Sequence, residues 1–185
     1  MEKRKSILEK LNDLDYDLDE KGSFIIKLGE HDKVSASLIE DELKLFFYDS
    51  HNYFWVRHAS VQVLLFDLKI KDTELLMFVK KVVVNPNEDF ELVSICLSGL
   101  GKLFFDEHDI ETISFLYAYA MNQTNDISHR CTALRSCLNV LGYNSISIIN
   151  KTQLDFLSDF DLSWFEGVMS VFNDELLKFI NPSNI

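Results

Sequence analysis

The chain has 185 residues, 47% of them hydrophobic, so it can bury the core of one domain or of one short repeat array and is too apolar for a disordered chain. A net charge of −12 argues against a nucleic-acid partner, because phosphate binding needs clustered Lys and Arg. The charge fits either a merely solvated surface or attraction to a basic partner.

The first thirty-three residues are predicted to form an N-terminal cap. Residues 3–12 are predicted to form a short helix, with Ile7, Leu8 and Leu11 on one side. Residues 13–19 then alternate acidic and apolar side chains, and residues 23–28 are rich in β-forming types. This pattern predicts a small N-terminal β-hairpin.

From Val34 onward the apolar spacing is helical and few Gly or Pro residues interrupt it, which favours long helices. Asp72, Asp109 or Asp106, and Asp126 are candidate N-caps, and Gly142 follows the end of a helix. The expected helices are residues 35–47, 53–68, 73–83, 89–104, 110–121 and 127–141, then one or two short helices in 145–156 and a longer one in 162–180.

Three segments within these helices resemble one another: residues 55–66, 91–102 and 129–140. In an alignment without gaps Val56, Leu92 and Arg130 correspond, so the steps are 36 and 38 residues. A period of this size indicates stacked helix pairs, in which each pair buries its apolar faces against its neighbours.

The segment Trp55-Val-Arg-His-Ala-Ser-Val-Gln-Val-Leu-Leu and the pairs Leu100-Gly101 and Leu141-Gly142 resemble the second helix of HEAT-like (armadillo-type) repeats. In the gap-free alignment, Arg130 falls one position early relative to Arg57. The resemblance implies an all-α fold, a short right-handed α-solenoid of HEAT-like helix pairs. It would form a single domain, with the cap in 1–33, three helix-pair repeats in 34–142 and capping helices in 143–185.

A mostly polar stripe, spaced three and four residues apart, runs along each of the three similar helices. The family resemblance implies that this stripe lines a concave binding surface, with Trp55 as its anchor. The alternative, that Trp55 packs on the preceding helix pair and the stripe is only solvated, stays open. The stripe comprises Trp55, His58, Gln62, Glu91, Ser94, Ser98, Lys102, His129, Thr132 and Ser136.

The sequence carries no catalytic, phosphate-binding or metal-binding motif that we recognise. The five histidines show no helical pairing, and Cys131 and Cys137 lack zinc-type spacing. We therefore predict no enzyme activity, no cofactor and no metal. Without a signal peptide or a long apolar run, we expect a cytoplasmic protein that does not enter a membrane.

Small size, strong negative charge and a Lys-, Asn- and Ile-rich composition are typical of a bacterial protein, and the chain is similar in these respects to immunity proteins that neutralise toxins. The resemblance implies a non-enzymatic binding protein with a basic protein partner. The acidic segments Asp13–Glu20 and Asp155–Asp161, including Asp155 and Asp159, would contribute to binding. The alternatives are an adaptor, a scaffold or a chaperone-like lyase subunit, and last a DNA-repair-type enzyme.

Overall fold

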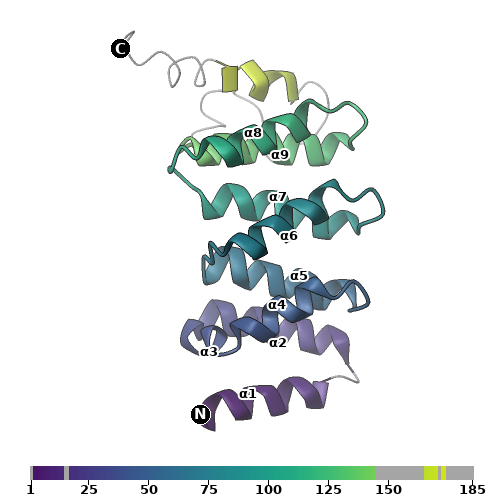
Figure 1. Cartoon of the computed structure of the whole chain (residues 1–185), viewed down its shortest axis with the longest axis vertical. Helices are drawn as coiled ribbons and strands as arrows, with labels where there is room; N and C mark the ends of the chain where they lie inside the picture. Colours follow the sequence, from purple (N-terminus) through teal and green to yellow (C-terminus); the bar gives the residue numbers. More distant parts are fainter. Residues whose placement is uncertain (1, 15–16, 145–164, 171, 174–185) are drawn as a thin grey trace. The chain divides into compact units, whose positions relative to one another are not determined.

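In the part of the chain that the structure describes, every regular element is helical (Figure 1). The structure is a computed structural model that describes residues 2–14, 17–144, 165–170 and 172–173. The all-α class is therefore confirmed. The chain divides into two compact units, Met1–Gly99 and Leu100–Ile185, which we call the first and second unit.

The first unit begins with α1 (Glu2–Asp13), α2 (Leu18–His31), α3 (Lys33–Ser37), α4 (Glu40–Tyr48) and α5 (Phe54–Gln62). In this unit α1 packs against α3, α2 against α3 and α5, and α4 against α5 (Figure 1). The helix α7 (Phe90–Leu103) starts in the first unit and ends in the second, where α8 (Ile110–Met121) packs on α9 (Ile127–Val140). Between α5 and α7 lie η2 (Val63–Asp67), which continues α5 as a π-helix, and α6 (Thr73–Val84).

The predicted N-terminal hairpin is wrong, because residues 23–28 lie inside α2. The Asp17 side chain caps this helix by accepting a hydrogen bond of 2.9 Å from the Glu20 backbone N–H. The buried residues of α2 include Ile25 and Leu28 and recur at helical spacing. The packing of that face against α5 outweighs the local preference of the β-forming residues for a strand.

Most of the later helix boundaries agree with the prediction. The side chains of Asp72, Asp109 and Asp126 cap α6, α8 and α9, and Gly142 has the left-handed backbone φ of 87° expected after a helix end. The expected helix over 35–47 is instead two, α3 and α4, because Ile39 leaves helical geometry and enters the core. The expected helices in 145–156 lie outside the described residues, and of 162–180 only residues 165–170 and 172–173 are described, as helix.

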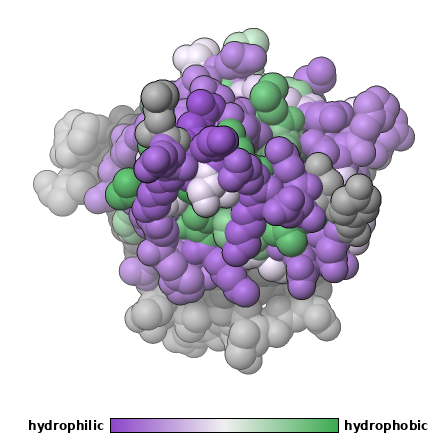
Figure 2. All heavy atoms as spheres, turned by 90° about the horizontal axis from the view of Figure 1, so that it is seen from below, coloured by the Kyte–Doolittle hydropathy of each residue, from purple (hydrophilic) through white to green (hydrophobic). Residues whose placement is uncertain are grey.

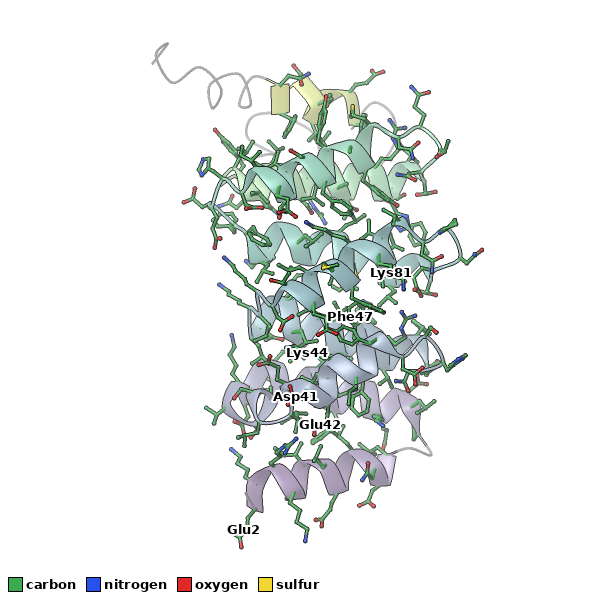
Figure 3. All side chains as sticks on the ribbon, viewed as in Figure 1. Glu2, Asp41, Glu42, Lys44, Phe47 and Lys81 are labelled. Atoms are coloured by element: carbon green, nitrogen blue, oxygen red, sulfur yellow. The ribbon has the colours of Figure 1, made fainter. Side chains whose placement is uncertain are left out.

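The core of the first unit is aromatic where α4 meets α6. Phe47 of α4, labelled in Figure 3, is fully buried. Its ring meets the Phe78 ring edge to face, with centroids 5.1 Å apart. At the border of this contact the Lys44 ammonium lies 2.8 Å from Glu40 and 3.2 Å from Asp72, so an ion pair also links α4 to the cap of α6. Apolar burial and this ion pair together fix the two helices side by side.

Glycines allow α2, α5 with η2, and α7, which we call the stacking helices, to approach closely. A Cβ atom placed on Gly29 of α2 would lie 2.6 Å from a Val63 methyl, and one on Gly99 of α7 would lie 2.5 Å from a Leu65 methyl. In the second unit, a Cβ on Gly101 would lie 2.7 Å from the Cα of Ser136 in α9. At each of these three helix–helix contacts, one helix therefore has a glycine where a side chain would clash with the other helix.

The contact at Gly101 gives a test of this packing. We expect Gly101→Ala to destabilise the protein by about 2 kcal/mol, because the clash with the Ser136 backbone outweighs the roughly 1 kcal/mol gain in helix propensity. The neighbouring exposed substitution Lys102→Ala should change stability by less than about 0.5 kcal/mol. Urea unfolding of the two variants makes the comparison, and a Gly101→Ala protein as stable as wild type would contradict it.

Candidate protein-binding surface

The predicted anchor Trp55 is half-buried and forms a pair with His58, one turn further along α5. The two rings stack with centroids 5.1 Å apart and an interplanar angle of 19°. A Cβ on Gly22 would lie 2.3 Å from the Trp55 ring, so the indole packs closely on the preceding stacking helix α2. The sequence left open whether Trp55 is a binding anchor or packs on the preceding helix pair. In the structure, part of its side chain packs on α2 and part is exposed.

The imidazole of His58 lies in a poorly solvated position. Its Nδ1 is buried and has no hydrogen-bond partner among the described residues. Burial lowers the pKa of His58 below its ordinary value of 6.5, and the nearby carboxylates of Glu91 and Asp89 oppose that shift. His58 is therefore a mostly neutral packing partner of Trp55 at neutral pH.

The remaining predicted residues of the first unit lie on α5 and α7. Gln62, Ser94 and Ser98 are half-buried and Glu91 is exposed. Together with Trp55 and His58, they leave part of their surface available to another molecule. In the second unit Lys102 is exposed, whereas Asp155 and Asp159 lie outside the described residues.

Three predicted surface residues of α9 are buried. His129 and Thr132 are each 6% exposed and Ser136 is 0% exposed. The Thr132 hydroxyl donates to the Ser128 carbonyl at 2.9 Å, and Ser136 packs on Gly101. Buried side chains offer no surface to a partner, so the prediction that these three residues line a binding surface is wrong.

The cause of this wrong prediction is an error of one residue in the alignment of α9 with α5. Hydrogen bonds in the turns before these two helices reveal the error. The Asn52 side-chain amide donates to the Phe46 carbonyl at 3.1 Å, and Asn125 donates to the Tyr119 carbonyl at 2.9 Å. Each donor lies 73 positions from its counterpart, and so does each acceptor. The same contact therefore recurs at an interval of 73 residues.

The two arginines show the same interval. The Arg57 Nε donates to the Phe47 carbonyl at 3.2 Å, and the Arg130 Nε donates to the Ala120 carbonyl at 2.7 Å. Arg130 is thus the counterpart of Arg57, whereas the gap-free alignment had placed it opposite Val56. The total step from α5 to α9 is 73 residues and not 74.

With this register the burial of α9 is explained. His129, Thr132 and Ser136 become the counterparts of residues on the packed side of the first similar helix: Val56, Ala59 and Val63, all of which are buried. The counterparts of Trp55, His58 and Gln62 are instead Ser128, Cys131 and Arg135. This packed face of α9 carries hydroxyl and imidazole side chains, and these polar residue types led to the prediction of an exposed polar stripe.

A buried ion pair that sequence reasoning missed joins α5 to the turn before α7. Arg57 Nη1 lies 2.6 Å from Glu88 Oε1, and Arg57 Nη2 lies 3.1 Å from Glu88 Oε2. The two side chains are 5% and 10% exposed. A signal was present in the sequence, because Glu88 occupies the place in Asn85-Pro-Asn-Glu88 that Asn52 and Asn125 hold in their own turns.

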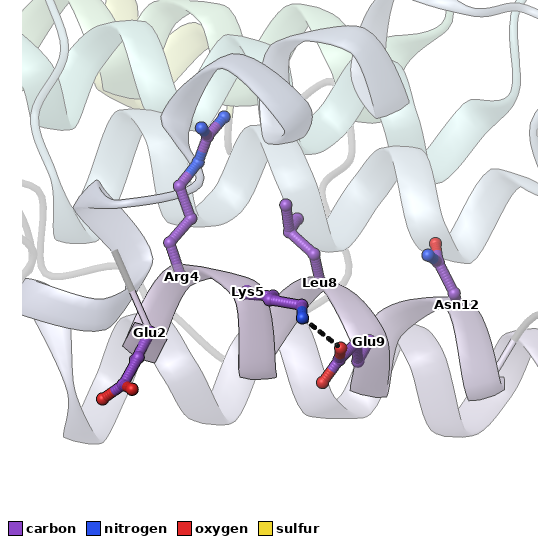
Figure 4. A pocket seen from close by; sticks show the side chains of 6 residues that line it. All are labelled: Glu2, Arg4, Lys5, Leu8, Glu9 and Asn12. Atoms are coloured by element: carbon purple, nitrogen blue, oxygen red, sulfur yellow. Dashed lines mark ion pairs between the residues drawn. The ribbon is translucent and has the colours of Figure 1, made fainter.

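Two surface hollows lie in the first unit. One has a volume of about 230 Å³ and is bordered by the Arg57–Glu88 pair and by Tyr48, whose pKa is raised by burial and by Glu74 and Asp72. The other follows one face of α1, where Lys5 pairs with Glu9 at 3.7 Å (Figure 4). The end of this unit that carries α1 is largely hydrophilic (Figure 2).

The described residues show no cluster of three or more potential metal ligands, and no helix among them is long and apolar enough to cross a membrane. Cys96, Cys131 and Cys137 are buried free thiols. Burial raises the pKa of both Cys96 and Cys137, so those two are poor nucleophiles. Comparison of the chain with protein-family models, curated proteins and solved structures finds no match.

The Arg57–Glu88 ion pair predicts that breaking a buried ion pair costs more stability than breaking an exposed one. Arg57→Met should lower the free energy of unfolding by about 3 kcal/mol, because it leaves the Glu88 carboxylate buried without its partner. Adding Glu88→Gln should recover part of that loss. Lys5→Met, which breaks the exposed Lys5–Glu9 pair, should cost less than about 0.5 kcal/mol. Equal losses for Arg57→Met and Lys5→Met in urea unfolding would contradict the assignment.

The lowered pKa of His58 predicts a pH dependence of stability. Below pH 6.5 the unfolded state takes up a proton at His58 more readily than the folded state does, so the contribution of this residue to stability falls as the pH falls. His58→Asn should therefore flatten the loss of stability between pH 7.5 and 5.5, as measured by urea unfolding. The control His51→Asn changes an exposed histidine. Unchanged pH dependence in His58→Asn would contradict the placement.

Proposed function

We propose that the chain is a non-enzymatic protein-binding module, built as a short α-solenoid of HEAT-like helix pairs, that binds and neutralises a basic protein partner. The recurrence of the Asn and Arg hydrogen bonds supports the repeat architecture, because unrelated helix pairs would not share both contacts at one interval. Arrays of this kind use their extended surfaces for binding.

The observation that carries the proposal is an acidic edge of the first unit. The segments that lead into α2, α5 and α7 lie on the same side of this unit, at the right of Figure 1. Residues 17–20, 49–54 and 88–91 contain no Lys or Arg. Their exposed carboxylates, which we call the acidic edge, are Asp17, Asp19, Glu20, Asp49, Asp89 and Glu91.

Part of this charge has an ordinary structural role. Asp17 caps α2, and Asp89 accepts backbone hydrogen bonds at the start of α7, from Glu91 at 2.9 Å and Leu92 at 3.2 Å. Asp19, Glu20 and Glu91 lie beyond the caps and add charge that capping does not need. Such a field accelerates encounter with a basic surface, and neutralising a toxin calls for rapid binding.

The test uses the partner that the tagged full-length chain captures from its source cells. The affinity should fall as salt rises, and Glu20→Gln with Glu91→Gln should lower the association rate about threefold or more. The matched control Asp41→Asn with Glu74→Gln removes two exposed carboxylates from the starts of α4 and α6. Its effect on the association rate should be smaller.

Two results would contradict the proposal. One is an affinity for the captured partner that does not change with salt. The other is an equal effect of the two pairs of substitutions, because the charge would then act without regard to the acidic edge.

A further inference from the structure

The acidic edge also holds a row of exposed apolar side chains. The first residues of the three stacking helices, Leu18, Phe54 and Phe90, are 38%, 38% and 47% exposed. They follow one another at steps of 36 residues. Phe54 contacts the rings of Tyr53 and Trp55, with centroids 5.0 Å and 6.5 Å away, yet more than a third of its side chain stays exposed. We call these three residues the apolar row.

Contacts at both ends of the stacking helices show that these helices run in register. Near the start, burial raises the pKa of Tyr53, and the neighbouring Asp19 carboxylate adds to that shift. Further along, Gly29 meets Val63, and Leu65 meets Gly99. Each of these contacts joins residues 34 positions apart. The apolar row therefore places one side chain on each of three neighbouring helices, and packed helices lie about 8–10 Å apart.

We infer that the apolar row binds an extended, basic segment of a partner protein, with an apolar side chain at every third residue and Lys or Arg between. A segment in the polyproline II conformation rises about 3.1 Å per residue and returns to the same face every three residues, so its apolar side chains lie about 9 Å apart. That repeat matches the helix spacing. This inference rests on the proposed function and names the form of the partner.

Charge decides between this occupant and a second copy of the chain. Two copies meeting through this row would bring together two acidic edges with no Lys or Arg in the segments that form them. Like charges at short range oppose such an association. A basic segment instead places its cations beside Asp19, Glu20 and Glu91 while its apolar side chains cover the row.

The experiment measures binding of fluorescent ten-residue peptides to the full-length chain by anisotropy. The first peptide has leucine at positions 2, 5 and 8 and lysine elsewhere. The second has the same composition with leucine at positions 2, 4 and 6, and the third replaces every lysine of the first with glutamine. We expect the first to bind about tenfold more tightly than either of the others, a difference of about 1.4 kcal/mol.

The protein variants locate the binding site. Leu18→Ser, Phe54→Ser and Phe90→Ser together should weaken binding of the first peptide by about tenfold or more, and Leu18→Ser alone by about threefold. The matched control, Val34→Ser, Leu45→Ser and Met77→Ser together, removes three more exposed apolar residues and should leave binding unchanged. Circular dichroism confirms that each variant is folded.

The outcomes separate this inference from the proposed function. Equal affinity for the first two peptides, no binding of the first, or an equal effect of the two triple variants would overturn the apolar row as a docking site. The proposed function would survive any of these results if the captured partner still bound in a salt-dependent manner. Loss of that salt dependence would overturn the proposed function itself.

Discussion

Close, in-register contact between the stacking helices is the constraint on which the rest of the first unit depends. At Gly29 and Gly99 there is no room for a side chain, so α2, η2 and α7 can approach only because these positions lack one. The approach fixes which residues of each helix face a neighbour. It also brings the starts of the three helices to one edge, where their first residues are exposed together with Asp17 and Asp89, the carboxylates that cap α2 and α7.

Polar contacts in the turns between helices also stabilise this arrangement. Asn52 ties its turn to the end of α4, and Glu88, at the corresponding place in its own turn, reaches back to Arg57 of the preceding stacking helix. An asparagine at that place binds within its own helix pair, whereas the glutamate links one pair to the next. The same structural position thus stabilises either a pair or the junction between two pairs.

The sequence predicted the helices better than it predicted their faces. Aspartate caps and apolar spacing located α6, α8 and α9 within a few residues, because those signals are local. The hairpin prediction failed because residues 23–28 were judged by their β-forming types, without the helical spacing of the buried residues Gly22, Ile25 and Gly29 over a longer segment. The prediction of an exposed polar face on α9 was wrong for a different reason. Residue types alone placed α9 74 residues after α5 instead of 73, and one residue turns a helix face by about 100°.

What the sequence could not supply were features that depend on tertiary contacts. The position of Glu88 in its turn matches that of Asn52 and Asn125, but its burial follows from the position of Arg57 some thirty residues earlier. The exposure of Leu18, Phe54 and Phe90 is likewise visible only after the helices are packed, since each could have been a core residue by type. The proposed binding edge therefore depends on the register between neighbouring helices. The apolar periodicity of the sequence determined that register less well than any other part of the fold.

Chemical cross-linking tests the in-register stacking most directly. Cysteines introduced in pairs at positions 18 and 54, 54 and 90, and 18 and 90 would be treated with a bis-maleimide that spans about 10 Å, the separation of neighbouring packed helices. The two adjacent pairs should cross-link efficiently, and the outer pair should not. Efficient cross-linking of the outer pair, or failure of either adjacent pair, would contradict the stacked arrangement and the binding edge that it creates.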